Sequence, residues 1–156
     1  MLRLAYLLVR IYCFFVRPIV LGVRVMLIQN GQVLLVRHTY IEGWFLPGGG
    51  LKRGETFEQA ARREAREEVG AELKELALVG AYSNFAEWKS DHTILFLSRD
   101  FKTSGGHDGE IAEARFFPLD GLPPALWAGH RRRLQEYADG GKRPLTAPDS
   151  PQHGEW

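Results

Sequence analysis

The chain has 156 residues, of which 25% are charged and 45% hydrophobic, a mixture typical of one globular domain with a sizeable core. Twenty basic and 19 acidic residues give a net charge of +1, so no overall field would attract nucleic acid, which is not expected as a partner. The single cysteine, Cys13, excludes an intramolecular disulfide and a cysteine-based zinc cluster, and it favours a reducing, cytoplasmic setting.

Residues 1–17 (MLRLAYLLVRIYCFFVR) predict an apolar N-terminal helix. Arg3, Arg10 and Arg17 recur every seven residues, which places them in one narrow stripe, while nearly all other positions are apolar. Such a helix needs burial on several sides. It could pack within the protein or in a homodimer, which is slightly preferred, or lie peripherally at a membrane surface. A signal or anchor segment is the weaker interpretation, because Arg10 interrupts the apolar run.

The next elements are a hairpin and a glycine turn. Pro18 ends the first helix, because a residue before proline avoids helical geometry. Two strand-like runs, VLGVRVMLI and QVLLVRH, then flank Asn30-Gly31, a dipeptide typical of tight hairpin turns. Pro47 and the glycines at 48–50 predict a turn whose backbone can approach a ligand closely.

A helix is predicted from Thr56 to about Val69. Thr56 and Gln59 have the spacing of a capping box, and Gly70 is a natural residue to follow the last turn. The pattern therefore fixes both ends of this helix.

Three glutamates of this helix, Glu64, Glu67 and Glu68, are spaced i, i+3, i+4 and so share one face, where they repel unless a cation lies among them. Hard oxygen ligands suit Mg²⁺ or Mn²⁺, which also bridge to phosphate oxygens. Glutamate runs are more often solvated faces with salt bridges, and neighbouring arginines could pair with them in that way. The glycine turn, together with Glu55 and Arg63 at fixed offsets, favours the metal site.

The later elements are mainly strands. Strands are predicted over Leu73–Tyr82, His92–Phe101 and Ala114–Leu119, with a glycine-rich loop at 103–109. A final helix follows Pro123-Pro124 and runs to about Tyr137, and its three arginines, 131–133, are expected to face solvent. His38 and His92 are expected to be structural.

The segment from Gly49 to Ala71 fits the pattern G-x5-E-x7-R-E-U-x-E-E-x-G-U, where U is aliphatic, and so resembles the box of the Nudix hydrolase family. The preceding GWFLPGGGL also resembles the family's strand and loop. The departures from the pattern are Ala65 and Ala71, where a larger aliphatic residue is usual. The charged and glycine positions are all filled, by Gly49, Glu55, Arg63, Glu64, Glu67, Glu68 and Gly70.

The resemblance implies an α+β fold, a Nudix-type α/β/α sandwich with a mixed β-sheet, over residues 18–140. Residues 1–17 would add the extra apolar helix, and residues 141–156 a disordered tail. The implied function is a divalent-metal-dependent hydrolase that cleaves the pyrophosphate bond of a nucleoside diphosphate linked to another moiety. The alternatives are a non-catalytic Nudix sensor of a nucleotide or metabolite, which need not keep the glutamates, and an interaction module using the first helix.

The resemblance also implies residue roles, with Mg²⁺ or Mn²⁺ as the cofactor. Arg63 is expected to orient the glutamates, and Glu55 to anchor the loop or Arg63. One glutamate could be the general base rather than a constant ligand. The groups expected to hold the metal are the side chains of Glu64, Glu67 and Glu68 and the carbonyl of Gly48.

Outside the box, the candidates for substrate binding are Arg37, Trp44, Tyr82, Phe85 and Glu110. Arg37 could meet a phosphate, the aromatic residues could stack a base, and Glu110 is the first choice for an additional loop acid, ahead of Asp108 and Glu113. An exposed cation, core aromatics and a solvated carboxylate are the alternatives. Nucleoside triphosphates, ADP-ribose, nucleotide sugars and damaged nucleotides all stay open as substrates.

Overall fold

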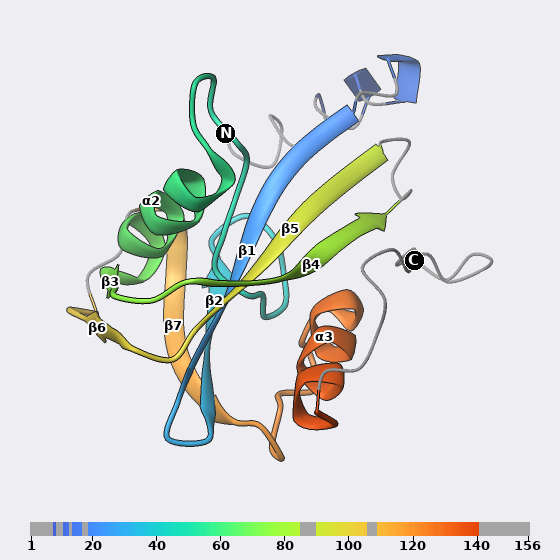
Figure 1. Ribbon diagram of the computed structural model, residues 1–156. Coiled ribbons are helices and arrows are strands. Elements are labelled where there is room, and N and C mark those ends of the chain that lie inside the picture. Colours follow the sequence, from blue (N-terminus) through green and yellow to red (C-terminus); the bar gives the residue numbers. More distant parts are fainter. Residues whose placement is uncertain are drawn as a thin grey trace.

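The structure is a computed structural model that describes residues 8, 11–12, 14–16, 19–84, 90–105 and 109–140. Within these ranges the elements, in chain order, are β1 (Ile19–Gln29), β2 (Gln32–His38), α2 (Phe57–Val69), β3 (Ala71–Leu73), β4 (Ala77–Asn84), β5 (Ser90–Ser98), β6 (Phe101–Thr103), β7 (Ile111–Pro118) and α3 (Ala128–Ala138) (Figure 1).

β1 lies at the centre of a five-stranded mixed sheet with the order β4-β5-β1-β2-β7. It pairs in parallel with β5 over Ile19–Leu27, whereas only its last residues pair with the antiparallel β2. The turn between β1 and β2 has φ values of 53° at Asn30 and 73° at Gly31, both positive, as the tight hairpin turn requires. The predicted hairpin is therefore confirmed.

α2 and α3 cover opposite faces of this sheet (Figure 1). On one face Val23 and Val25 of β1 pack in a cluster with Ala60 of α2. On the other face Met26 of β1 packs in a second cluster with Leu134 of α3. Successive residues of a strand point to opposite faces, so a strand covered on both sides is apolar throughout. The predicted α/β/α sandwich with a mixed sheet is confirmed.

Two predicted strands are each divided in the structure. The first prediction began at Leu73, which is the last residue of β3, and the second ended at Phe101, which is the first residue of β6. β3 and β6 pair with each other in a separate two-stranded sheet, and the backbone N–H of Lys74 donates to the Asp100 carbonyl at 3.0 Å beside them. The pattern of apolar residues could not reveal this division, because a strand's partner is set by contacts distant in sequence.

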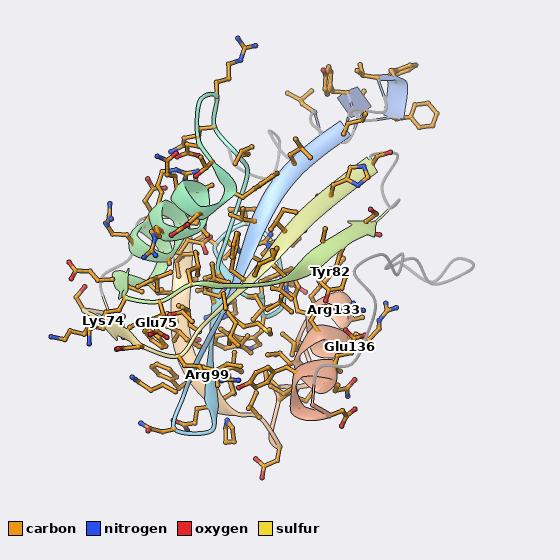
Figure 2. All side chains as sticks on the ribbon, viewed as in Figure 1. Lys74, Glu75, Tyr82, Arg99, Arg133 and Glu136 are labelled. Atoms are coloured by element: carbon orange, nitrogen blue, oxygen red, sulfur yellow. The ribbon has the colours of Figure 1, made fainter. Side chains whose placement is uncertain are left out.

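The expectation that all three arginines of α3 face solvent is wrong for Arg133, which is 5% exposed. Its guanidinium lies 4.3 Å from the centroid of the Tyr82 ring and 3.0 Å from the Glu136 carboxylate (Figure 2). A buried guanidinium is retained when an aromatic face and a carboxylate both offset its lost hydration. This group attaches α3 to β4.

The predicted N-terminal helix falls mostly on residues outside the described ranges. Leu8, Ile11, Tyr12 and residues 14–16 are helical and exposed, so a continuous helix stays a prediction. The predicted tail at 141–156 also lies outside the described residues. No helix within the described ranges is long and apolar enough to cross a membrane.

Candidate active site

α2 carries the three glutamates, and local interactions fix both of its ends. The Thr56 hydroxyl accepts the Gln59 backbone N–H at 3.2 Å, while the Gln59 side chain accepts the Thr56 N–H at 2.8 Å. Gly70 follows the last turn with φ of 61°. The capping box and terminal glycine are thus confirmed, and they set which face of α2 meets the sheet.

The two alanines that depart from the usual box pattern are both enclosed. Ala65 is 0% and Ala71 is 1% exposed, and both belong to the core cluster between α2 and the sheet. Small side chains here let the helix lie close to the sheet. Their effect is therefore on packing, and the glutamates keep their positions on the helix.

The glycine turn runs antiparallel to the first half of β1, like an additional strand. Gly48 lies between two bonded positions, so its own N–H and carbonyl point away from β1. Three backbone hydrogen bonds join the two segments: Val23 N–H to Gly49 O at 2.9 Å, Val25 N–H to Pro47 O at 2.9 Å, and Leu51 N–H to Leu21 O at 3.0 Å.

Gly48 is held from both sides. Its N–H donates to the Glu68 carboxylate at 2.8 Å. Its carbonyl accepts from the Arg24 guanidinium, which also donates to the Leu46 carbonyl at 3.1 Å. Only glycine fits here, because φ is +141° and an added Cβ would lie 2.2 Å from the Val23 carbonyl oxygen. Sequence analysis missed Arg24, although one arginine inside the apolar run VLGVRVMLI was a signal.

Glu68 is the buried glutamate of the site, with 6% exposure. Besides accepting the Gly48 N–H, its carboxylate lies 3.9 Å from Nε2 of the equally buried His38 on β2. A buried carboxylate needs such partners to offset the loss of hydration. These contacts hold the Glu68 side chain of α2 between the sheet and the glycine turn.

The Glu64 carboxylate lies against the same turn at Gly49, one residue after Gly48. A Cβ built on Gly49 would lie 2.7 Å from Glu64 Oε1. The missing side chain therefore leaves a cradle in which the backbone of the turn lies directly against the carboxylate.

Arg63 is the cation that offsets the like charges of Glu64 and Glu67. Its guanidinium donates to five acceptor atoms on four residues, and several of these bonds are short and charge-assisted. The contacts are to Glu55 Oε1 at 2.6 Å and Oε2 at 2.9 Å, Glu64 Oε1 at 2.6 Å, Glu67 Oε2 at 3.1 Å and the Gly50 carbonyl at 3.1 Å. Arg63 thus connects the glutamate face of α2 to the loop that precedes it.

The Arg63–Glu55 pair shifts both groups toward their charged forms. The hydrogen bond from Arg63 lowers the pKa of Glu55 from 4.5 to about 2, and a backbone hydrogen bond from Lys52 acts in the same direction. The same bond raises the pKa of Arg63 above its ordinary value. Both groups are therefore ionised throughout the neutral range.

This shift predicts a pH dependence of stability. Because the pKa of Glu55 is lower in the folded chain, its contribution is fully present above pH 4.5 and is lost as the pH falls from 4.5 toward 2. In Glu55→Gln we expect a flatter dependence of Tm on pH across that interval, measured by circular dichroism. Glu58→Gln, an exposed position in the first turn of α2, is the control and should keep the original slope.

The donor set fits a hard divalent cation. Three carboxylates on one helical face and the backbone oxygens of the turn are the ligands that Mg²⁺ and Mn²⁺ prefer, and the absence of a side chain at Gly49 lets the turn lie against the Glu64 carboxylate. In this structure Arg63 binds Glu64 and Glu67, and Gly48 binds Glu68. Accordingly, no three acidic, histidine or cysteine side chains converge within the described part of the chain.

Two aromatic candidates for substrate binding, Trp44 and Tyr82, lie on the α3 side of the sheet. Trp44 and Tyr82 pack against the core cluster on the α3 face, and Arg37 shares a face of β2 with Leu35 of that cluster, whereas α2 covers the other face. Trp44 packs edge-on to Phe117 with ring centroids 4.8 Å apart. Trp44 and Tyr82 therefore lie on the face of the sheet that α3 covers.

Arg37 is paired at the end of β2. Its guanidinium donates to Glu113 at 3.0 Å, and Arg115 contacts the same carboxylate. The hydrogen bond from Arg37 lowers the pKa of Glu113. Glu110 is exposed just before β7, and Phe85 lies outside the described residues.

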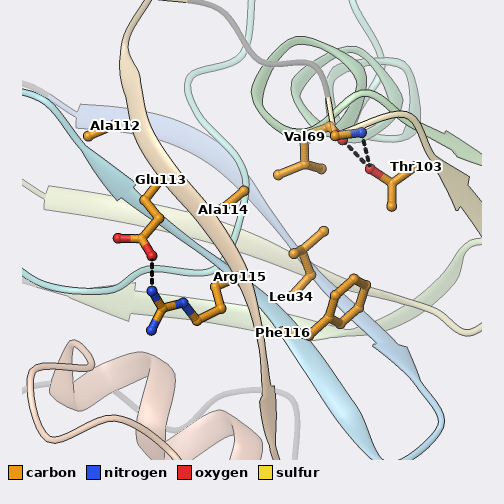
Figure 3. Close-up of a pocket in the computed structure, with 9 residues that line it drawn as sticks. Leu34, Val69, Thr103, Ala112, Glu113, Ala114, Arg115 and Phe116 are labelled. Atoms are coloured by element: carbon orange, nitrogen blue, oxygen red, sulfur yellow. Dashed lines mark hydrogen bonds and ion pairs between the residues drawn. The ribbon is translucent and has the colours of Figure 1, made fainter.

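A separate shallow hollow lies between β7, β6 and the end of α2 (Figure 3). The Thr103 hydroxyl there bonds to the Val69 carbonyl. The described lining includes Glu113 and Arg115 and none of the four glutamates around Arg63 and Gly48. This hollow is therefore not the candidate site.

Most of the chain is similar to known proteins. A family model for the NUDIX domain matches residues 18–137. The chain is 30% identical over 135 residues to the 8-oxo-dGDP phosphatase NUDT18 of Homo sapiens, which covers 80% of this chain and 41% of that protein. It is 32% identical over 117 residues to the ADP-ribose pyrophosphatase of Methanocaldococcus jannaschii, which covers 70% of this chain and 67% of that protein.

The fold is also shared with solved structures. A MutT NUDIX hydrolase from Burkholderia pseudomallei has a TM-score of 0.68 and 24% sequence identity, covering 75% of this chain and 96% of that chain. The chain spans about two-fifths of the length of NUDT18, so the likeness to that protein concerns one part of it.

Proposed function

The chain belongs to the Nudix hydrolase family, and from that membership we propose that it hydrolyses the pyrophosphate bond of a nucleoside diphosphate linked to another moiety. The observation that carries the proposal is the glycine turn held against the carboxylates of α2. The Gly48 N–H donates to the Glu68 carboxylate at 2.8 Å. The Glu64 carboxylate lies so close to Gly49 that a Cβ there would be 2.7 Å from its Oε1. A turn and helix held in this way can present oxygen ligands and a polarised water to a phosphate group.

Nudix hydrolases generally use divalent metal ions, and we propose Mg²⁺ or Mn²⁺ for this chain. The proposed ligands are the carboxylates of Glu64, Glu67 and Glu68 and the carbonyl of Gly48. When bound, the ion would polarise the phosphoryl oxygens and lower the pKa of a bound water. This chemistry suits pyrophosphate, whose dense negative charge must be neutralised before attack.

The chain's own residues would position these groups. Arg63 holds Glu64 and Glu67 on one side of the helix, and Glu55 fixes Arg63 in turn. Glu68 fixes the Gly48 peptide. One of the three glutamates of α2 would accept the proton of the attacking water as general base.

We propose a small nucleotide-type substrate and a cytoplasmic setting. The two named relatives support testing 8-oxo-dGDP and ADP-ribose first, because both compounds contain a nucleoside diphosphate. Our candidates for substrate binding are Arg37, Trp44, Tyr82, Phe85 and Glu110. The N-terminal segment would serve as a contact surface, for a second copy of the chain or for a membrane, apart from catalysis.

A panel assay tests the proposal. Phosphate and pyrophosphate release would be measured for nucleoside di- and triphosphates and oxidised nucleotides, and formation of the nucleoside monophosphate would be measured by chromatography for ADP-ribose and nucleotide sugars, with Mg²⁺, Mn²⁺ or a chelator in each case. We expect turnover of at least one compound that requires metal and is lost in Glu67→Gln. Glu58→Gln is the matched control, because Glu58 lies on the same helix, exposed and paired with Arg62 at 2.9 Å.

The alternative, a non-catalytic sensor, gives a different result in the same experiment. Folded chain that binds a nucleotide by calorimetry but turns over none of the panel would favour the sensor. Retention of the whole glutamate and arginine cluster supports the hydrolase, since a sensor has no need for a metal-activated water.

A further inference from the structure

An exposed apolar surface extends from the described N-terminal residues onto the start of β1. Phe15 is 77% and Ile19 is 74% exposed. In Figure 1 the described turns of this segment stand beyond the start of β1, away from α2 and α3. Exposed apolar surface of this extent marks an interaction site. The other exposed large apolar residues in it are Leu8, Ile11, Tyr12, Phe14, Val16 and Leu21.

Every charged side chain in residues 1–41 is basic. Arg3, Arg10 and Arg17 recur at intervals of seven residues among apolar neighbours. All 19 acidic residues follow residue 41, and the first of them is Glu42. The net charge of +1 for the whole chain therefore combines a basic N-terminal region with a remainder that is acidic overall.

We propose that this surface docks on the headgroup region of an anionic lipid bilayer. The arginines of this segment would meet the lipid phosphates, and its apolar side chains would enter the region of the acyl chains. A second copy of the segment would bring no carboxylate to the arginines, since residues 1–41 contain none. A bilayer supplies both the apolar phase and the negative charge.

The docking surface reaches the glycine turn through the backbone. Leu21, which is 46% exposed, accepts a hydrogen bond from Leu51 at 3.0 Å, and Gly22 lies opposite Gly50. Docking through Ile19 and Leu21 would therefore place the turn beside the bilayer surface. The docking itself does not depend on the proposed hydrolase function.

Cosedimentation of the whole chain with lipid vesicles tests this proposal. We expect binding to vesicles of phosphatidylcholine mixed with phosphatidylglycerol to be at least roughly tenfold tighter than to phosphatidylcholine alone, with a strong decrease at high salt. Replacing Arg3, Arg10 and Arg17 together by glutamine should weaken binding to the anionic vesicles on the order of hundredfold. The double variant Phe14→Ser, Phe15→Ser should weaken binding to both kinds of vesicle.

The control variant replaces three exposed cations outside the segment, Arg66, Lys74 and Lys102, by glutamine and should bind as tightly as the parent. Circular dichroism would verify that each variant is folded. Equal binding of the parent and the N-terminal arginine variant would overturn the proposal. So would a lipid-free dimer by analytical ultracentrifugation that dissociates in the phenylalanine variant, which would assign the surface to a second copy.

Discussion

Glu68→Gln is expected to lower kcat on the order of 10²–10³-fold, with little change in Tm. Glutamine keeps an oxygen that can accept the Gly48 N–H, so the glycine turn should keep its position. The substitution removes only the negative charge. Because Glu68 is buried, water cannot replace that charge's electrostatic effect. The substitution therefore separates the charge of Glu68 from its structural hydrogen bond.

Steady-state kinetics on the compound found in the panel assay, together with thermal unfolding, would measure this effect. Glu58→Gln should retain parental kcat, because Glu58 is exposed and pairs with Arg62. Parental kcat in Glu68→Gln would exclude its charge from catalysis. A large decrease in Tm would instead show that Glu68 acts mainly through the fold.

Gly48→Ala is expected to destabilise the chain by about 3 kcal/mol and to remove most activity. The added Cβ would lie 2.2 Å from the Val23 carbonyl oxygen and 2.9 Å from the Arg24 Cα, both of them backbone atoms of the central strand. Because neither can rotate away, the turn must move, and its hydrogen bonds to Glu68 and Arg24 would be lost. For a domain of this size the corresponding decrease in Tm is roughly 6–12 °C.

Gly50→Ala is the matched control, because Gly50 lies in the same turn and a Cβ there would meet no atom within 4 Å. Differential scanning calorimetry should find Gly50→Ala close to the parent. An equal effect of the two substitutions would mean that the turn requires glycine for general flexibility rather than for the close approach at Gly48.

The features that sequence analysis predicted well depend on residues close together in the chain. The capping box of Thr56 and Gln59, the Asn30-Gly31 turn and the spacing of the glutamates are each local patterns with a direct physical cause. The pairing of strands is different, because it depends on which distant segment supplies the partner. The parallel β1–β5 pair and the separate β3–β6 sheet were therefore not predicted.

The distant partners of two arginines were the other omission. Arg24 in β1 and Arg133 in α3 each have partners far away in the sequence, namely the Leu46 and Gly48 carbonyls for Arg24 and the Tyr82 ring for Arg133. Alternation along a strand or helix indicates which face a residue occupies, but it does not identify the group that it meets there. The partners of both arginines could be identified only from the folded structure.

The glycine turn also protects an edge of the sheet. β2 pairs only with the end of β1, so on that side the first half of β1 would expose unpaired backbone groups beside Val23 and Val25. Residues 47–51 of the turn form hydrogen bonds with these backbone groups instead. Open apolar edges recruit strands from other molecules. A substitution that displaces the turn would thus create a self-associating surface as well as an inactive protein, and loss of activity should be accompanied by aggregation at high concentration.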